Sequence, residues 1–404
     1  MTASLDRRLF LRTLGLGAAS LLTPFGCEDS GRYLDSDIER LAEQKRLEKE
    51  RAGQGPFGSH RYRGYRGLAD LPYFELDSKD RLRCIVEDLP PIIDFHAHLG
   101  LSVLFAPTID WMAKTQRVRH FLDCDATNPG CELDLDVYIN ANFTEKDLES
   151  LRRETVAQAI WGSESAATHT IPNLLAEMDG VGIQLAVILP IALGLPFRDD
   201  SSERWAAAIA SSGHEDRLLP GATVHPRDPD AVSSLRLQVA RGARALKLHP
   251  AVQRFYPDSP ELHPIYSECE KLGIPVFFHG GRAGIEPEYT HRYTLIRHYE
   301  GAVASHPQVQ FVLGHAGARD VGDAIPFAIR HRNVWLGIHG QGISVLRELI
   351  DRVGAQRLLF GTDWPFYHLG ASLAKVLIVT EGRPEERTAI LQANAESLLA
   401  REAS

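Results

Sequence analysis

The clearest pattern along the chain is a series of short, mainly apolar runs separated by amphipathic stretches. Short runs bounded by polar residues are typical of parallel strands that are buried on both faces. The stretches between them repeat apolar residues at helical spacing, and this alternation predicts parallel βαβ units. Four helices are expected over Pro172–Asp179, Asp230–Arg241, His263–Leu272 and Val345–Val353. Eight strands are expected over Ile92–Phe95, Leu185–Pro190, Leu218–Val224, Ala243–Leu248, Pro275–Phe278, Val309–Leu313, Val334–Ile338 and Leu358–Phe360.

Eight such units in roughly 300 residues fit an α/β fold, the (β/α)8 TIM barrel, better than a doubly wound open sheet. The barrel is preferred because polar residues follow several strands, where they would share one rim. We assign it to residues 91–402. The gap before Leu185 is too long for a loop. We therefore expect a rim insertion over about residues 100–170, with a helix at Leu148–Ile160, that shapes the substrate pocket.

Residues 1–27 have the character of an export signal rather than of the fold. The pair Arg7-Arg8 precedes the apolar, small-residue stretch Thr13–Phe25 and resembles a twin-arginine signal. Cys27 follows Gly26 in a context similar to the lipidation site of bacterial lipoproteins, with plain cleavage as the alternative. We therefore expect a periplasmic protein, either free or anchored by lipid at Cys27.

Residues 28–90 are expected to form an extension that links the signal to the barrel and lies against it. Within it, Asp35–Arg51 is rich in Glu, Lys, Arg and Ala and predicts a solvated helix. In the insertion, Cys124 and Cys131 flank the turn signal Asn128-Pro129-Gly130. An oxidising compartment would allow these two cysteines to pair, and two unpaired thiols are the alternative.

Composition narrows the class of partner. Hydrophobic residues make up 44% of the chain and charged residues 24%, which is ordinary for a globular protein. The formal net charge of −9 gives no indication of nucleic-acid binding. No apolar run reaches the ~18 residues of a transmembrane span. The expected partner is a small-molecule substrate, and a homo-oligomer is left open.

Histidines follow most of the predicted strands, and this is the strongest functional signal. His96 and His98 end the first strand one residue apart, so their side chains point to the same face. Neutral imidazole is a common metal ligand, and such a pair suggests half of a zinc site. Histidines or an aspartate also follow the third to eighth strands, at His225, His249, His279, His315, His339 and Asp363.

The ordered motifs HxH, KLHP, FFHGG, LGHAG and FGTDWP resemble the amidohydrolase superfamily over about residues 90–400, in particular its amidohydrolase-related branch. The resemblance implies a barrel that holds a divalent metal, usually zinc. It also implies hydrolysis or non-oxidative decarboxylation. His96, His98, His279 and Asp363 match the metal ligands of the family. Asp363 could also accept the proton of a metal-bound water, and His315 matches the acid–base histidine of the family.

Three further rim residues are candidates for substrate binding. Lys247 matches the lysine that is carbamylated and bridges two metals in binuclear amidohydrolases. We favour one metal, with Lys247 binding a substrate carboxylate and His249 beside it. The guanidinium fork of Arg282 could clamp a carboxylate, and a salt bridge at the rim is the alternative. His225 and His339 are interpreted as residues that line the pocket.

Three functions are therefore considered. The first is a metal-dependent hydrolase that uses a zinc-activated water on an amide, ester or lactone. The second is a metal-dependent decarboxylase of a small unsaturated or aromatic carboxylic acid. The third is an exported, non-catalytic metal-binding barrel, which the full ligand set and His315 disfavour. Export favours hydrolysis, because the decarboxylases of this branch belong to cytoplasmic catabolism.

Overall fold

The computed structural model describes residues 31–124, 131–195 and 199–400. Contacts divide the chain into two compact units, Met1–Glu43 and Gln44–Ser404. Helix α2 (Asp35–Arg51) has the predicted bounds and passes from the first unit into the second. The predicted export signal lies outside the described residues, so export, cleavage and lipidation at Cys27 stay predictions. In the part of the chain that is described, every helix is too short or too polar to cross a bilayer.

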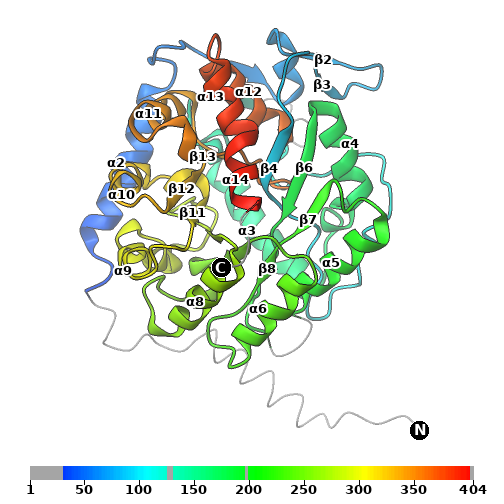
Figure 1. Ribbon diagram of the computed structural model, residues 1–404. Coiled ribbons are helices and arrows are strands. Elements are labelled where there is room, and N and C mark those ends of the chain that lie inside the picture. The colour runs from blue at the N-terminus through cyan, green and yellow to red at the C-terminus, as the bar shows by residue number, and fades with distance from the viewer. Residues whose placement is uncertain (1–30, 125–130, 196–198, 401–404) are drawn as a thin grey trace. The chain divides into compact units, whose positions relative to one another are not determined.

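All eight predicted strand regions form parallel strands, and most of these strands are labelled in Figure 1. The third region is divided at Gly221, because Leu218–Pro220 pairs with Ile183–Ile188 and Ala222–Thr223 pairs with Leu246–Leu248. A Cβ at Gly221 would lie 2.8 Å from the carbonyl oxygen of Ile188, so only glycine allows this close approach. The strands are β4 (Ile92–Ala97), β6 (Ile183–Ile188), β7 (Leu218–Pro220), β8 (Ala222–Thr223), β9 (Leu246–Leu248), β10 (Val276–Phe278), β11 (Phe311–Leu313), β12 (Val334–Gly337) and β13 (Leu358–Leu359).

The sheet closes into a barrel between the first and last strands. The amide of Phe95 donates to the carbonyl of Phe360 at 3.0 Å. Just beyond, the amide of Asp363 donates to His96 at 2.8 Å, and the amide of His98 donates to Trp364 at 2.7 Å. These bonds bring the ends of β4 and β13 together and place His96, His98 and Asp363 on one rim. The predicted (β/α)8 barrel is confirmed.

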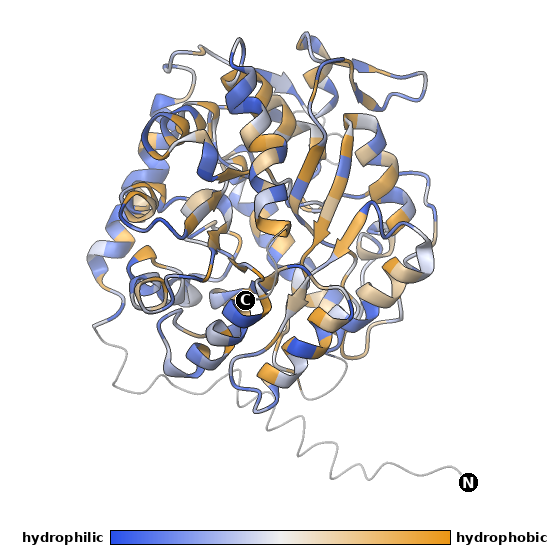
Figure 2. Ribbon diagram, viewed as in Figure 1, coloured by the Kyte–Doolittle hydropathy of each residue, from blue (hydrophilic) through white to orange (hydrophobic). Residues whose placement is uncertain are grey.

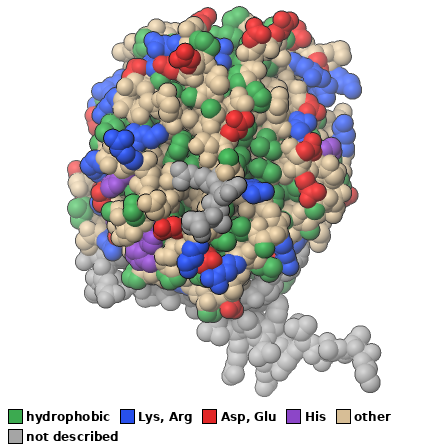
Figure 3. All heavy atoms as spheres, in the orientation of Figure 1, with side chains coloured by type: hydrophobic (Ala, Val, Ile, Leu, Met, Phe, Trp, Pro, Cys, Tyr) green, Lys and Arg blue, Asp and Glu red, His purple; other side chains and the backbone are tan. Residues whose placement is uncertain are grey.

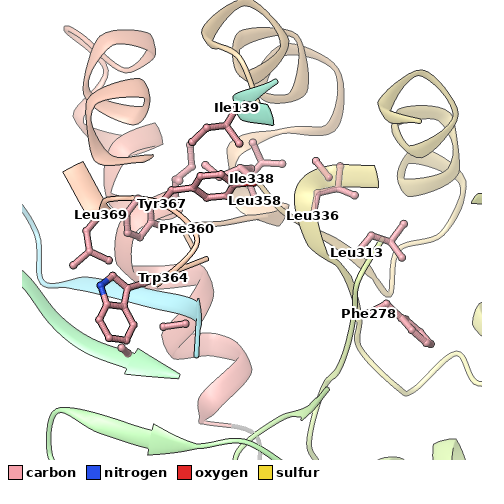
Figure 4. Packing of buried hydrophobic residues seen from close by; sticks show 14 of the residues in the cluster. Ile139, Phe278, Leu313, Leu336, Ile338, Leu358, Phe360, Trp364, Tyr367 and Leu369 are labelled. Carbon is pink, nitrogen blue, oxygen red and sulfur yellow. The ribbon is translucent and has the colours of Figure 1, made fainter. Parts of the chain in front are cut away.

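Helices surround the strands and turn their apolar faces inward, as the colouring of Figure 2 shows. In α11, buried Ile343, Leu346 and Ile350 follow the helical repeat. Residues after the last strand join the same core, including Trp364 and Leu369 (Figure 4). The main outer helices are α4 (Ile171–Val181), α5 (Ser201–Ser212), α6 (Ala231–Ala240), α8 (His263–Leu272), α9 (Glu300–Ser305), α10 (Val321–Arg330), α11 (Ile343–Val353), α12 (Leu369–Val379), α13 (Pro384–Thr388) and α14 (Asn394–Leu399).

The segments around the rim have their own structure. In the extension, β1 (Arg61–Arg63) pairs antiparallel with β5 (Glu132–Asp134) of the insertion, and β2 (Phe74–Leu76) pairs with β3 (Leu82–Cys84). The insertion also contains α3 (Glu145–Ile160), which begins with a capping box between Thr144 and Asp147. Cys124 and Cys131 form a disulfide, as expected if the two cysteines pair and not if they stay as free thiols.

Candidate active site

His98 and Asp363 define the centre of the site. The Nε2 atom of His98 lies 3.2 Å from Oδ1 of Asp363, and Nδ1 lies 2.6 Å from the carbonyl oxygen of Leu189. A carbonyl only accepts, so Nδ1 of His98 donates to Leu189 and Nε2 is the atom that faces the carboxylate. An imidazole nitrogen and a carboxylate oxygen at this separation can share a proton or bind one cation. The donor geometry therefore fits a metal site.

His96 completes this group from the same strand. Its Nε2 atom lies 3.6 Å from Oδ1 of Asp363 and 3.0 Å from Nζ of Lys247. The ligand atoms of His96, His98 and Asp363 all lie within 4.8 Å of one another. Burial lowers the pKa of His96 well below its usual value, and the nearby Lys247 acts in the same direction. His96 is therefore a neutral ring that can donate a lone pair.

The motif Gly361-Thr362-Asp363 places the carboxylate by local hydrogen bonding. The hydroxyl of Thr362 donates to Oδ2 of Asp94 at 2.5 Å, and its amide donates to Oδ1 at 3.0 Å. Asp363 itself adopts a left-handed backbone with φ of 60°, which aspartate tolerates better than most residues. A Cβ at Gly361 would lie 3.1 Å from the Cβ of His96, so glycine leaves room for that ring.

Asp94 lies within a predicted strand and supports the site without belonging to any of the predicted motifs. It is fully buried and also accepts the amide of His96 at 3.0 Å. Burial raises the pKa of Asp94 to about 7, although the bonds from Thr362 and His96 oppose this shift. Asp94 thus ties the first and last strands together directly beneath the site.

Electrostatics around Asp363 and Lys247 favour an ionised carboxylate. Burial alone raises the pKa of Asp363, but the contact with His98 and the neighbouring His339 and Lys247 outweigh it and leave the pKa below its usual value. Burial lowers the pKa of Lys247 to about 7, and Asp363 opposes this shift. The ammonium group also lies 4.7 Å from the centre of the Phe277 ring. Lys247 therefore faces the site between an aromatic ring and His96.

His279 lies beside this group rather than inside it. Its ring stacks on that of His249 with centroids 4.0 Å apart, and its Nδ1 atom lies 3.2 Å from Nε2 of His315. Among the described residues, nothing forms a hydrogen bond with its buried Nε2 atom. Because buried polar atoms are nearly always satisfied, this atom is suited to a metal or a substrate. Its role as a ligand stays a prediction.

His315 faces Asp363 from the loop after β11. Its Nε2 atom lies 3.9 Å from Oδ2 of Asp363, and its backbone is left-handed with φ of 55°. Gln341 donates to its carbonyl oxygen at 2.6 Å and holds this unusual turn. Burial, with His339 next, lowers the pKa of His315 well below its usual value. The histidine is thus neutral and adjacent to the carboxylate.

The other rim histidines differ in position. His339 lies in the cluster, where its Nε2 atom is 2.7 Å from Nδ1 of His96. His249 caps the short helix α7 (Pro250–Gln253) through a bond from the amide of Val252 at 3.4 Å. His225 accepts the amide of Arg227 at 3.3 Å. His339 and His249 are buried, whereas the exposed histidines on the face in Figure 3 form small separate patches among charges of both signs.

Arg282 is engaged by the protein itself. Its guanidinium binds Asp320 through Nε at 2.9 Å and NH2 at 2.5 Å, and both side chains are buried. The fork that we expected to hold a substrate carboxylate thus already holds an aspartate. The geometry favours the salt-bridge alternative for Arg282. The sequence alone could not distinguish a salt bridge from a clamp for a substrate carboxylate.

Replacing Asp320 with asparagine should destabilise the protein by about 3–5 kcal/mol, because it leaves the buried guanidinium of Arg282 without its counter-charge. The midpoint of urea unfolding measures this loss. Glu348→Gln breaks the exposed pair with Arg352 and should cost only about 0–1 kcal/mol. Equal unfolding midpoints for the two variants would contradict a stabilising role for the buried pair.

The fold and the buried cluster of histidines and aspartate define a TIM-barrel enzyme with a candidate divalent-metal site. Residues 93–401 match the family model described as Amidohydrolase, and the chain belongs to this family. Gamma-resorcylate decarboxylase from Rhizobium radiobacter is 24% identical over 258 residues, which are 48% of this chain and 76% of that protein. The same enzyme from a Rhizobium species, strain MTP-10005, is 25% identical over the same shares.

Solved structures agree on the fold. A TIM-barrel protein from Bordetella bronchiseptica has a TM-score of 0.52 and 23% identity, covering 77% of this chain and 99% of its own. 2,6-Dihydroxybenzoate decarboxylase from Rhizobium has a TM-score of 0.51 and 20% identity, covering 61% of this chain and 94% of its own. At these identities the structural similarity supports the barrel fold and gives no information about the substrate.

Proposed function

We propose that this protein is a metal-dependent, non-oxidative decarboxylase of a small aromatic or unsaturated carboxylic acid. The observation that carries the proposal is its similarity to the gamma-resorcylate decarboxylases. Hydrolysis, the first function expected from the sequence, is supported only by membership of the broad superfamily. This similarity favours the decarboxylase alternative, and the predicted export signal, which favoured hydrolysis, lies outside the described residues.

His96, His98 and Asp363 would hold the metal, with His279 as a further ligand. Their fit rests on the Nε2 atom of His98, which faces Asp363, and on the buried Nε2 atom of His279, which has no hydrogen-bond partner among the described residues. A bound divalent ion would act as a Lewis acid that stabilises negative charge on the substrate. Zinc is the specific prediction, because three imidazole nitrogens and one carboxylate are a common zinc donor set.

The protein supplies proton transfer and a dry site. Decarboxylation breaks the bond to the carboxylate carbon, leaves the electron pair on the substrate carbon and replaces CO2 with a proton. His315 is neutral at rest, and we propose that it takes up a proton beside the ionised carboxylate of Asp363, 3.9 Å away, and passes this proton to the substrate carbon. Because His96, His315 and Asp363 are all buried, competing water is excluded and charge interactions are strengthened. Lys247 is placed to bind the negative charge of the substrate.

The test compares two panels of compounds with one metal-loaded preparation. We expect release of CO2 from hydroxybenzoates such as 2,6-dihydroxybenzoate, with formation of the corresponding phenol. We expect no turnover of aryl esters, lactones or amides. Elemental analysis of the same preparation gives the metal and its stoichiometry, with about one zinc per chain expected. Hydrolysis of an ester or lactone without CO2 release from any acid would overturn the proposal in favour of a hydrolase.

A further inference from the structure

A tyrosine from the rim insertion contacts His315 on the side away from Asp363. The hydroxyl oxygen of Tyr138 lies 3.1 Å from Nδ1 of His315, and the two rings meet edge to face. Tyr138 is 4% exposed, and burial raises its pKa well above the usual value, so the hydroxyl keeps its proton. Within the described part of the chain, Tyr138 is the hydrogen-bond partner of this nitrogen. The position of the His315 ring thus depends on this contact.

A buried ion pair holds Tyr138 in place. The guanidinium of Arg319 lies 5.2 Å from the centre of the tyrosine ring, and its Nε atom binds Oε2 of Glu48 at 3.1 Å. The other carboxylate oxygen of Glu48 accepts the backbone amide of Tyr138. Both charged side chains are at most 8% exposed, so the pair is shielded from water. Glu48 therefore fixes the tyrosine through its backbone and through its ring.

The barrel contributes the remaining constraint on this segment. The amide of Ile139 donates to the carbonyl of Gly340 at 2.8 Å, and Asn140 donates to the carbonyl of Ala283 at 3.0 Å. Gly340 has a φ of +87°, and a Cβ there would lie 2.9 Å from the ring of Tyr138. Arg319 also donates to Ala283 at 2.8 Å. The insertion is thus anchored to the loops after β10 and β12, so the hydroxyl of Tyr138 is presented from a fixed backbone.

We propose that Tyr138 is a positioning residue for His315, and that Glu48 of the N-terminal extension acts on the reaction through Arg319 and Tyr138. The proposal rests on the proposed proton-transfer role of His315. Glu48 precedes the matched family region, 93–401, so this contact adds an element outside that region to the active site. The extension is then part of the catalytic apparatus and not only a linker.

The physical basis is the orientation of a ring. An imidazole with both nitrogens engaged has one favoured rotation and one tautomer, and loss of the contact at Nδ1 frees both. Replacing Tyr138 with phenylalanine keeps the ring under Arg319 and removes only the hydroxyl. We expect kcat to fall by about 10–100-fold with KM nearly unchanged, as for other groups that orient a catalytic or ligating histidine.

Glu48→Gln tests the more distant step. This change preserves shape and leaves Arg319 without its counter-charge, so kcat should fall in the same direction by a smaller factor. The double variant should lose no more than Tyr138→Phe alone, because both changes act through one contact. Glu50→Gln is the matched control on the same helix. It breaks an exposed pair with Arg46 and should leave kcat and melting temperature unchanged.

A second readout does not depend on turnover. The ring ¹⁵N signals of His315 can be assigned by their loss in His315→Gln and then compared between parent and Tyr138→Phe without metal. We expect a shift that reports a changed tautomer balance. A parent that releases no CO2 while this signal moves contradicts the proposed function and supports the positioning role. The inference is overturned if folded Tyr138→Phe keeps both the parent ¹⁵N shift and the parent kcat. It is also overturned if the variant only melts at a lower temperature while the ¹⁵N shift and kcat stay unchanged.

Discussion

Replacing Asp363 with asparagine should remove the bound metal and the activity together. The carboxylate lies 3.2 Å from Nε2 of His98 and 3.6 Å from Nε2 of His96, so it completes the group of ligand atoms. It also faces His315, which links it to proton transfer. We expect metal content far below one ion per chain and kcat lower by about 10²–10⁴-fold or more. Elemental analysis and kinetics on the same preparation measure both.

Asparagine is the informative substitution because of the backbone. Asp363 has a φ of 60°, a conformation that asparagine adopts readily and alanine does not. A loss of function in Asp363→Asn can then be attributed to the missing carboxylate and not to backbone strain. Asp351→Asn is the control, since its carboxylate lies on the surface in a pair with Arg347. If the Asp363→Asn variant kept both full metal content and full turnover, the assigned ligand set would be contradicted.

The residues that the sequence predicted best are those whose place follows from local pattern. Strand alternation put His96 and His98 on one face, and the end of the last predicted strand put Asp363 on the same rim. The backbone bond from Asp363 to His96 at 2.8 Å shows how barrel closure turns these separate motifs into neighbours. The (β/α)8 fold was predictable for the same reason, because each strand is a short apolar run and each helix repeats apolar residues at helical spacing.

The rest of the site depends on contacts between segments far apart in the chain. Tyr138 and Glu48 carry no motif, and their contacts with Arg319 depend on how residues 44–90 and the insertion fold against the barrel. The fork of Arg282 is chemically suited to any carboxylate, and only the structure shows that Asp320 takes it. The contact between Asp94 and Thr362 likewise joins the first strand to the last motif. These contacts join residues far apart in the chain, so the spacing of residues in the sequence could not predict them.

Replacing His315 with asparagine should leave metal content near that of the parent and lower kcat by about 10²–10⁴-fold. The histidine faces the carboxylate at 3.9 Å but lies outside the predicted ligand set, so its loss removes proton transfer and no ligand. Asparagine suits the left-handed backbone at this position, where φ is 55°. Metal stoichiometry, melting temperature and kcat should be measured on the same preparations.

The competing explanation makes His315 a structural residue that holds the turn at Gly314–Gly317 in place. In that case the variant would melt at a lower temperature, and the molecules that remain folded would turn over at the parent rate. His306→Asn is the control for this outcome. His306 is also buried and binds His263 at 2.9 Å, but it lies before β11 and not after it, so its loss should lower stability and spare kcat. If His315→Asn also lowers the melting temperature and leaves kcat unchanged, His315 takes no part in proton transfer. Another group near Asp363 must then supply the proton.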